Sequence, residues 1–530
     1  MHRADVAVDR LGIGPFATPA KPGVGEVVGV VTAALLAHAR ALANGFAWDD
    51  RHTVVANPAL RSLAALVRSF GMDDWEGYGL RARGLYRPLT TVSLWLDRLL
   101  SGEPAFGYHL TSLALHALTA IALLLVLRRA DVRGVIAAAV AVLFAVHPLT
   151  AEVANWISAR PDGLSTALAV GALLAAVRDR PILAAFLAVL APWAKEPGLL
   201  AIPAVLTVTW SRAPRLRASV STAVAAGGAA GYLLARHLAH VPSNEAVARL
   251  AHPAGWRTVL QGAGNALLGF AAAVMTPLPL DLGRRLPSHA TAGLAAGLLL
   301  AFGTAAALAW CWRRRQPLTA AALLLVAGSL ALVGAYGVNL SERYLYLPLA
   351  ATTVLAALAL EAAARRWPAV SEARPSLALR VVTAALVLCA AAADFARAGE
   401  WSDPLTLFGS AVQADAANPE SWQLYGAELY RAGRRQEALA AFERSAALGS
   451  TQAGLYSNLC AVRRELGDLN RASGDCDRAV ALDPGDPRPR YNRALLLAQL
   501  GRTAEAVAEL RDLVRQHPGY TPARRALEAR

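Results

Sequence analysis

The sequence predicts an all-α protein in two parts, a multi-spanning membrane domain and a C-terminal domain of helical repeats. The first observation is composition: of 530 residues, 55% are hydrophobic and 17% are charged. Soluble chains usually carry about a quarter charged residues. The second is a 34-residue period in polar, helix-forming sequence after Trp401. We therefore expect an N-terminal cytoplasmic segment at 1–25, a membrane domain at 26–395, a connector at 396–418 and repeats at 419–530.

Apolar stretches of spanning length, about 17–25 residues, recur throughout the membrane domain. They lie at roughly 26–43, 110–128, 134–150, 162–177, 181–194, 196–211, 218–236, 258–278, 290–312, 318–338, 343–364 and 376–393. We expect about 11–12 transmembrane helices from them. The first stretch also resembles a signal peptide, since Ala41-Leu42-Ala43 resembles a cleavage site, but the long preceding segment and the many later spans favour an anchor.

The net charge of +14 comes with short arginine clusters between the apolar stretches. A nucleic-acid site would need a continuous basic face with interleaved aromatic residues, so we expect no nucleic-acid partner. Arginines are retained on the cytoplasmic side of a membrane. This rule places the first loop, 44–109, and the repeats outside, provided that 258–278 makes no net crossing. Pro277 and Pro279 favour a re-entrant or interfacial segment there.

The C-terminal period is carried by residues of fixed type. Glycines and alanines recur 34 residues apart, an aromatic residue stands near the start of each unit and a proline near its end, as in Gly433, Gly467 and Gly501; Ala438, Ala472 and Ala506; Trp422, Tyr456 and Tyr491; Pro484 and Pro518. This pattern is typical of tetratricopeptide repeats. Three repeats form a self-supporting solenoid that binds a protein partner. Cys460 and Cys476 fall at positions of two paired helices that normally face each other. In an oxidising compartment a disulfide between them is one alternative. The favoured interpretation is that both are small, unlinked residues of the core.

Asp49 and Asp50 are the strongest candidates for chemistry. They directly follow the first apolar stretch, and Arg51 is the only adjacent cation. Two carboxylates at the emerging end of a membrane helix are costly, so we favour a functional role for them. The same outer loop carries Arg87 and His109.

Further polar patches fall on the same predicted side. They contain His147, Glu152 and Arg160; Lys195 and Glu196; and Asn339 to Tyr346 with Glu342, Arg343 and Tyr344. Ionisable residues at membrane depth mark a substrate path or a paired interaction. The structural alternatives are ion pairs between helices, Glu152 with Arg160 and Glu342 with Arg343, and a self-neutralising pair of Lys195 with Glu196. His109 and His116 lie on the same helical face, but the sequence offers no partner cysteine and only distant carboxylates as further ligands. A divalent metal ion bound there is therefore an alternative that we do not favour.

The order of these motifs resembles a known family. Trp48-Asp49-Asp50, Tyr86-Arg87-Pro88-Leu89, Gly107-Tyr108-His109-Leu110, His147-Pro148 through Glu152 to Trp156, Lys195-Glu196 and Glu342-Arg343-Tyr344-Leu345-Tyr346 follow one another over about 26–410. This succession resembles the transmembrane and tetratricopeptide-repeat O-mannosyltransferases. More broadly, it is similar to GT-C glycosyltransferases that use polyprenyl-phosphate sugars. The Ala-, Arg- and Gly-rich composition suggests a bacterial member.

The resemblance implies transfer of a hexose, mannose in the first place, from a polyprenyl-phosphate donor to a serine or threonine hydroxyl of an exported protein. It implies an inner-membrane enzyme whose site and repeats face the periplasm. Asp49 would be the catalytic base, Asp50 its support, and Glu152 would orient the base or hold the acceptor. Substrate contacts would come from Arg87, His109, His147, Arg160, Lys195, Glu196, Arg343 and Tyr344, with the cations directed at the lipid phosphate.

Two other functions remain open on the sequence. One is a GT-C transferase that modifies lipid or envelope polysaccharide, and the other is a non-catalytic, membrane-anchored repeat scaffold. Convergence of Asp49, Glu152, Lys195 and Arg343 within ~10 Å would favour an enzyme, because that is the scale of a small ligand pocket. Scattered, separately paired residues would favour the scaffold.

Overall fold

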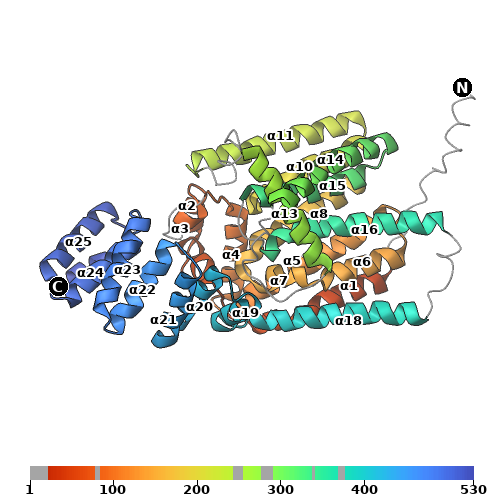
Figure 1. Ribbon diagram of the computed structural model, residues 1–530. Helices are drawn as coiled ribbons and strands as arrows, with labels where there is room; N and C mark the ends of the chain where they lie inside the picture. Colours follow the sequence, from red (N-terminus) through yellow and green to blue (C-terminus); the bar gives the residue numbers. More distant parts are fainter. Residues whose placement is uncertain are drawn as a thin grey trace, which may run out of the picture. The chain divides into compact units, whose positions relative to one another are not determined.

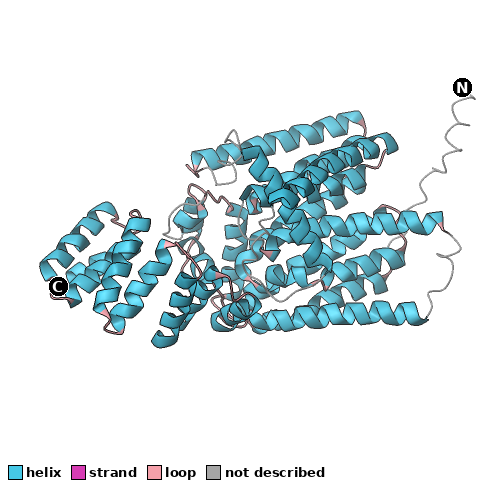
Figure 2. Cartoon of the chain, viewed as in Figure 1, coloured by secondary structure: helices cyan, strands magenta, loops and turns pink. Residues whose placement is uncertain are grey.

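The computed structural model describes residues 22–77, 84–242, 255–275, 290–336, 341–367 and 377–529. Every regular element in these ranges is helical, and they contain no strand (Figures 1 and 2). The all-α class predicted from the sequence is therefore confirmed. The chain divides between Trp401 and Ser402 into two compact units, inside the segment expected to connect the domains. The predicted N-terminal segment 1–25 lies almost wholly outside the described residues.

The first unit, called the membrane unit here, comprises the described residues up to Trp401. Its helices are α1 Val24–Ala37, α2 Leu63–Ser69, α3 Asp74–Gly77, α4 Pro88–Ser101, α5 Ala105–Arg129, α6 Gly134–Ala145, α7 Ala151–Asn155, α8 Arg160–Val177, α9 Pro181–Ala194, α10 Ala201–Arg212, α11 Arg215–Leu238, α13 Gly255–Met275, α14 Ala290–Arg314, α15 Pro317–Tyr336, α16 Tyr346–Arg366 and α18 Leu377–Glu400. Helix α5 packs against α1, α6 and α8, and α15 packs against α10, α13 and α16. Polar turns between these helices carry most of the candidate site.

Six helices of the described residues are long and apolar enough to cross a membrane, or seven if α6 and the bent segment after it form one span. The chain is therefore an integral membrane protein. This number is smaller than the 11–12 predicted. Helices α6, α9 and α10 have 12, 14 and 12 residues. At 1.5 Å per residue, 14 residues reach about 21 Å, short of the ~30 Å hydrocarbon core.

The segment 258–278, expected to make no net crossing, lies largely within α13. That helix is continuous over 21 residues and qualifies as a span by its length and composition. Pro277 and Pro279, on which the expectation of a broken helix rests, lie outside the described residues. Re-entry of this segment therefore stays a prediction.

The second unit, called the repeat unit here, follows Ser402. It contains α19 Pro404–Ala414, α20 Pro419–Arg431, α21 Arg435–Ala447, α22 Ala453–Glu465, α23 Leu469–Leu482, α24 Pro487–Gln499, α25 Thr503–Gln516 and α26 Thr521–Glu528. The first helices of the three repeats, α20, α22 and α24, each begin 34 residues apart. Gly433, Gly467 and Gly501 end them with φ of 77°, 85° and 79°. Residues with a Cβ rarely adopt this left-handed conformation, which explains the periodic glycine.

Cys460 on α22 and Cys476 on α23 form a disulfide. The Cα atoms lie 5.2 Å apart, within the range that a disulfide requires, and both residues are fully buried. The favoured expectation of unlinked small core residues was therefore wrong. Helical pairing brings the two Cβ atoms face to face, which residue type alone does not reveal.

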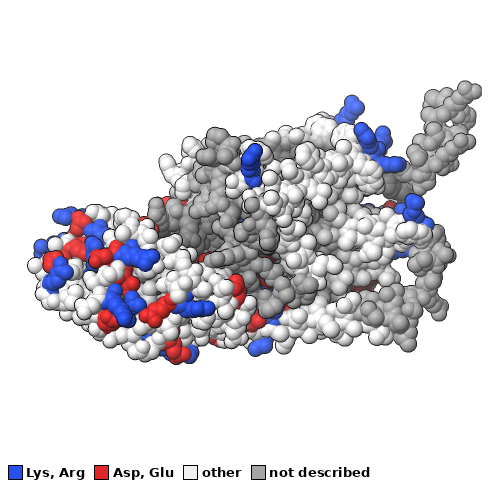
Figure 3. All heavy atoms as spheres, in the orientation of Figure 1, with Lys and Arg blue, Asp and Glu red and all other residues white. Residues whose placement is uncertain are grey.

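Surface charge differs between the two units. Figure 3 shows lysine, arginine, aspartate and glutamate interspersed over the repeat unit, whereas the membrane unit is largely uncharged. Lysine and arginine atoms of the membrane unit gather near the ends of α14 and α16 at the right of the view. Helices α5, α14 and α16 each carry arginines in the last turn. An uncharged belt with arginines at one end is the pattern of a membrane-embedded bundle.

Removing the disulfide is predicted to loosen the second repeat. The double substitution Cys460→Ala and Cys476→Ala should lower the free energy of opening of α22 and α23 by about 3 kcal/mol, because the bridge closes a short loop in the unfolded chain. Hydrogen–deuterium exchange on the full chain measures this change. Cys389→Ala, which removes an exposed free cysteine, is the control. Equal exchange in α22 and α23 of all three proteins would contradict the prediction.

Candidate active site

Asp49 and Asp50 have different surroundings although they are adjacent. The Asp50 carboxylate is fully buried and accepts hydrogen bonds from Ala47 N (3.0 Å), Ser158 N (2.8 Å) and Ser158 Oγ (2.5 Å). It thereby fixes the loop after α1 to the 3₁₀ turn Ile157–Ala159. Asp49 is half-buried, and its carbonyl accepts from the backbone and hydroxyl of Thr53. Asp50 is thus a structural acceptor, whereas the Asp49 carboxylate is partly accessible.

Three tryptophans stack beside this loop. Trp48 lies parallel to Trp156, with ring centroids 4.9 Å apart and planes at 8°, and Trp156 stacks on Trp401 at 5.5 Å. Trp156 Nε1 also donates to Ala47 O at 3.3 Å. The backbone of Trp48 has φ of 48°, a left-handed conformation that costs a non-glycine residue roughly 1–2 kcal/mol. The stack therefore holds a strained residue directly before Asp49, and such strain clusters at functional sites.

Glu152 is the acceptor of a second polar centre. It is 1% exposed and accepts from Ser341 Oγ (2.6 Å), Arg343 N (2.9 Å) and Arg343 Nη1 (2.7 Å). The Arg343 guanidinium lies over the rings of Trp156 at 4.7 Å and Tyr344 at 4.8 Å. Because Trp156 also stacks on Trp48, this centre joins the loop that carries Asp49.

Tyr344 lies between two cations. Lys195 Nζ is 4.7 Å from its ring centroid, and Arg343 approaches the same ring. The Lys195 ammonium also interacts electrostatically with the Arg87 and Arg343 guanidinium groups. Two cations, from the turn after α9 and the turn before α16, thus contact one aromatic ring, and Arg87 of the first loop interacts electrostatically with one of them.

Each of these cations has a carboxylate partner distant in sequence. Lys195 Nζ donates to Asp162 at 2.5 Å, in contrast to the local pair with Glu196. Glu196 instead accepts from Arg87 Nε at 3.2 Å and Nη2 at 3.1 Å. Lys195 and Glu196, which the sequence offered as a self-neutralising pair, therefore each form hydrogen bonds with a different, distant partner. Adjacent residues of a turn point in different directions and do not face each other.

The suggested pair of Glu152 with Arg160 was wrong, and Glu342 binds a partner distant in sequence. Arg160 is 1% exposed and donates to Asp97 (2.8 Å) as well as to Ser112 Oγ and Tyr108 O, so it does not pair with Glu152. Glu342 accepts two 2.6 Å hydrogen bonds from Arg397 of α18. Arg160 thus connects α4, α5 and α8 as a structural residue.

The two predicted histidines contact backbone groups. His109 Nε2 lies 3.3 Å from Gly45 O, and His147 Nδ1 accepts from Leu149 N at 3.2 Å. His116, which shares a helical face with His109, contacts Tyr346 Oη at 2.8 Å. No group of three or more histidine, cysteine, aspartate or glutamate side chains suited to a metal occurs within the described ranges. The structure therefore adds no support for the open alternative of a divalent cation. Asn339 and Leu340, the first two residues of the predicted patch from Asn339 to Tyr346, lie outside the described residues.

Asp74 was missed by sequence reasoning. It accepts from Arg87 N at 3.3 Å and interacts electrostatically with the Arg87 and Glu196 side chains. The signal was available, because Asp73-Asp74 is a second acidic pair in the same outer loop. Asp73 instead accepts from Trp75 N and Leu85 N, so the two carboxyls of this pair also have different surroundings.

Asp50 and Asp74 are predicted to make the stability of the membrane unit depend on pH. Burial raises the pKa of each carboxyl from 3.8 to about 7. Between about pH 4 and 7 the folded state keeps protons that the unfolded state has lost, so stability should fall as pH rises through this window. Asp50→Asn with Asp74→Asn should flatten the decline in thermal stability, whereas Glu103→Gln, an exposed control, should not. A decline of unchanged slope in the double variant would refute this.

Comparisons with known proteins agree with both units. A family model described as Tetratricopeptide repeat matches residues 458–530, which confirms the predicted repeats. Protein O-mannosyl-transferase F38B6.6 of Caenorhabditis elegans is 27% identical over 195 residues, 35% of this chain and 28% of the relative. Protein O-mannosyl-transferase TMTC3 of Homo sapiens is 31% identical over 190 residues, 33% of this chain and 20% of the relative.

The chain thus matches less than a third of the length of these two relatives. Among solved structures, the crystal structure of MamA is 20% identical with a TM-score of 0.22, covering 25% of this chain and 75% of that chain. The similarity to O-mannosyl-transferases, together with the tetratricopeptide repeats, confirms the resemblance given by the motifs.

Proposed function

We propose that this protein is a membrane glycosyltransferase that moves a hexose, mannose in the first place, from a polyprenyl-phosphate carrier to a serine or threonine hydroxyl of an exported protein. The observation that carries the proposal is the contact path from the Asp49 loop through Trp48 and Trp156 to Arg343, and on through Tyr344 to Lys195. It runs from the residue before Asp49 to two of the candidate cations, Arg343 and Lys195. Similarity to named O-mannosyl-transferases supports the same reaction class.

In the proposed reaction Asp49 accepts the proton of the acceptor hydroxyl. The hydroxyl oxygen then forms a bond to the anomeric carbon, and the bond from that carbon to the phosphate oxygen breaks. The phosphate leaves with the electron pair, and the sugar passes through a transition state of oxocarbenium character. A carboxylate near the sugar stabilises this positive charge, while cations stabilise the leaving phosphate.

The phosphate is assigned to Arg343, Lys195 and Arg87. A guanidinium binds phosphate oxygens through two parallel N–H donors, and an ammonium acts as a compact charge. Glu152 holds both the backbone and the side chain of Arg343, so its proposed role is to orient this arginine. Glu196 and Asp162 hold Arg87 and Lys195 in the same way.

The proposed orientation places the site and the repeats on the periplasmic side of a bacterial inner membrane. The arginine-bearing helix ends support this orientation through the positive-inside rule. The Cys460–Cys476 disulfide supports an oxidising compartment for the repeats. There the repeats would bind the protein acceptor or a partner that delivers it.

Asp49→Asn is predicted to reduce sugar transfer by about 10²-fold or more, because a positioned general base contributes about 10²–10⁴ to the rate. The assay uses native membranes, a labelled polyprenyl-phosphate mannose and glycoproteomic detection of acceptors. Glu103→Gln, in the same outer loop, should keep full activity. Undiminished transfer by Asp49→Asn would refute the assignment of the base. Labelled lipid or polysaccharide in place of protein would identify the other transferase class, and absence of any wild-type transfer would favour the scaffold.

Arg343→Lys is predicted to raise the donor KM and lower kcat/KM by about tenfold, because the charge is kept but the paired N–H donors are lost. Arg61→Lys, an exposed arginine of the same outer loop, is the matched control. The measurement is transfer at varied donor concentration with acceptor held constant. Identical kinetics for Arg343→Lys and the wild type would remove Arg343 from the donor site.

A further inference from the structure

Two arginines from distant parts of the chain meet at one buried carboxylate of the membrane unit. The side chain of Glu361 on α16 is 7% exposed, and it accepts hydrogen bonds from Arg133 N at 3.0 Å and from Arg365 Nε at 2.8 Å. Arg133 Nε lies 3.4 Å from the same carboxylate. Arg365 Nη2 also donates to Asp131 O at 2.8 Å. Glu361 therefore holds the loop between α5 and α6 against the last turn of α16.

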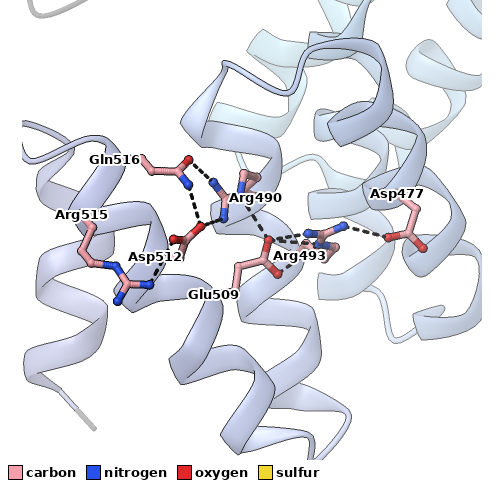
Figure 4. A network of polar contacts seen from close by, with 7 residues as sticks. All are labelled: Asp477, Arg490, Arg493, Glu509, Asp512, Arg515 and Gln516. Atoms are coloured by element: carbon pink, nitrogen blue, oxygen red, sulfur yellow. Dashed lines mark hydrogen bonds and ion pairs between the residues drawn. The ribbon is translucent and has the colours of Figure 1, made fainter.

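This cluster differs from the charge networks of the repeat unit, where each arginine has its own acid. Figure 4 shows such a network, in which Arg490 Nη2 lies 2.6 Å from Asp512 and Arg493 Nη2 lies 2.6 Å from Glu509. Around Glu361 two arginines share one carboxylate. Their side chains are nevertheless 41% and 59% exposed, so guanidinium donors that Glu361 does not bind stay accessible.

Two further arginines flank the cluster. Arg129 ends α5 and Arg366 ends α16, and both are exposed. Among the described residues no carboxylate is in salt-bridge contact with either of them, and Asp131 is the one acid in the loop between α5 and α6. Helix α6 begins directly after this loop, so the positive end of its dipole lies at the same place. The charge at this end of α16 is therefore positive, as Figure 3 shows.

The surface beside these arginines is apolar. Trp367, the residue after Arg366, is 58% exposed, and Val135 in the first turn of α6 is 80% exposed. Tryptophan is enriched where membrane helices reach the lipid head groups. The segments that end at Arg129 and Arg366 both have the length and composition of a membrane span. The cluster thus lies at the level of the head groups, with apolar surface beside it.

A positive charge on this side of a bundle is not in itself a binding site. Arg313, Arg314 and Arg315 are also exposed, at the end of α14, on the same predicted side of the membrane. Among the described residues, no carboxylate joins these three to another helix. The Glu361 cluster differs because an acid holds its arginines in place, and donors that are already ordered lose less conformational freedom when they bind an anion.

We propose that the Glu361 cluster binds an anionic phospholipid, whose phosphate is held by Arg133 and Arg365. Arg129 and Arg366 add positive charge, and the acyl chains lie along the apolar surface at Trp367. In the orientation proposed above, this lipid belongs to the cytoplasmic leaflet. Helix α16 has the candidate active site at its start and this cluster at its end, about 30 Å apart at 1.5 Å per residue. Lipid binding is therefore separate from sugar transfer, and either can fail without the other.

The test titrates the full-length protein in neutral detergent with phosphatidylglycerol and measures bound lipid by native mass spectrometry. Phosphatidylcholine, which has the same phosphate but no net charge, is the reference lipid. The wild-type protein should bind its first phosphatidylglycerol at least about tenfold more tightly than its first phosphatidylcholine. Equal affinity for the two lipids would overturn the proposal.

One variant removes the arginine pair together with its acid. Combining Arg133→Gln, Glu361→Gln and Arg365→Gln leaves no buried charge without a partner, so the fold should persist, and circular dichroism checks this. The affinity for phosphatidylglycerol should fall about tenfold, whereas that for phosphatidylcholine should stay as in the wild type. An unchanged affinity for phosphatidylglycerol in the folded variant would overturn the proposal.

Two double variants distinguish a defined site from diffuse charge. Arg129→Gln with Arg366→Gln removes two exposed arginines beside Glu361, and Arg313→Gln with Arg314→Gln removes two at the end of α14. Both variants lose the same net charge, and neither removes a residue with an ion-pair partner among the described residues. The first should bind phosphatidylglycerol about tenfold more weakly, and the second should bind it like the wild type. Equal affinities of the two variants would show that position does not matter and would refute a site at Glu361.

Discussion

The arrangement of the candidate site depends on the buried ion pair between Glu152 and Arg343. Taking both charges out of water is costly, and the cost is offset only when the charges are paired and the remaining oxygens are hydrogen-bonded. Glu152 meets this condition with three short hydrogen bonds, two of them from Arg343. Arg343 is thereby fixed over Trp156, which stacks on the residue before Asp49. Loss of the pair would release the cation and leave Glu152 buried without its partner.

Two pairs of adjacent, oppositely charged residues in the candidate site also have distant partners. Glu342 and Arg343 are adjacent, yet one binds α18 and the other binds α7. Lys195 and Glu196 likewise bind α8 and the first outer loop. An oppositely charged pair of neighbours therefore connects two separate parts of the chain. In a bundle with little water, such pairs hold the polar turns in place where apolar packing alone is not specific for one arrangement.

Much of the fold could be predicted from the sequence, because period and apolar length are local properties. The repeat register is an example, since α22 and α24 begin 34 residues apart as Gly467 and Gly501 indicate. Six or seven helices of the described residues have the length and composition of a span, fewer than predicted, because apolarity does not determine whether a polar turn divides a stretch, as it does after α9. The four polar patches were identified, but their partners were not. Pairing depends on which helices are neighbours, and residue spacing within one patch carries no information on this.

The division of roles between Asp49 and Asp50 shows how the site's geometry limits its chemistry. A carboxylate that accepts three hydrogen bonds inside the protein has few positions left for a substrate proton, and Asp50 is such a group. Its bonds to Ser158 fix the loop and thereby the position of Asp49, the preceding residue of the chain. The candidate cations are limited in the same way. Each of them already donates hydrogen bonds to a carboxylate of the protein, so only its remaining N–H donors can bind a phosphate. On the proposed function, these residual donors bind the phosphate of the donor and stay with it as charge develops on the departing group.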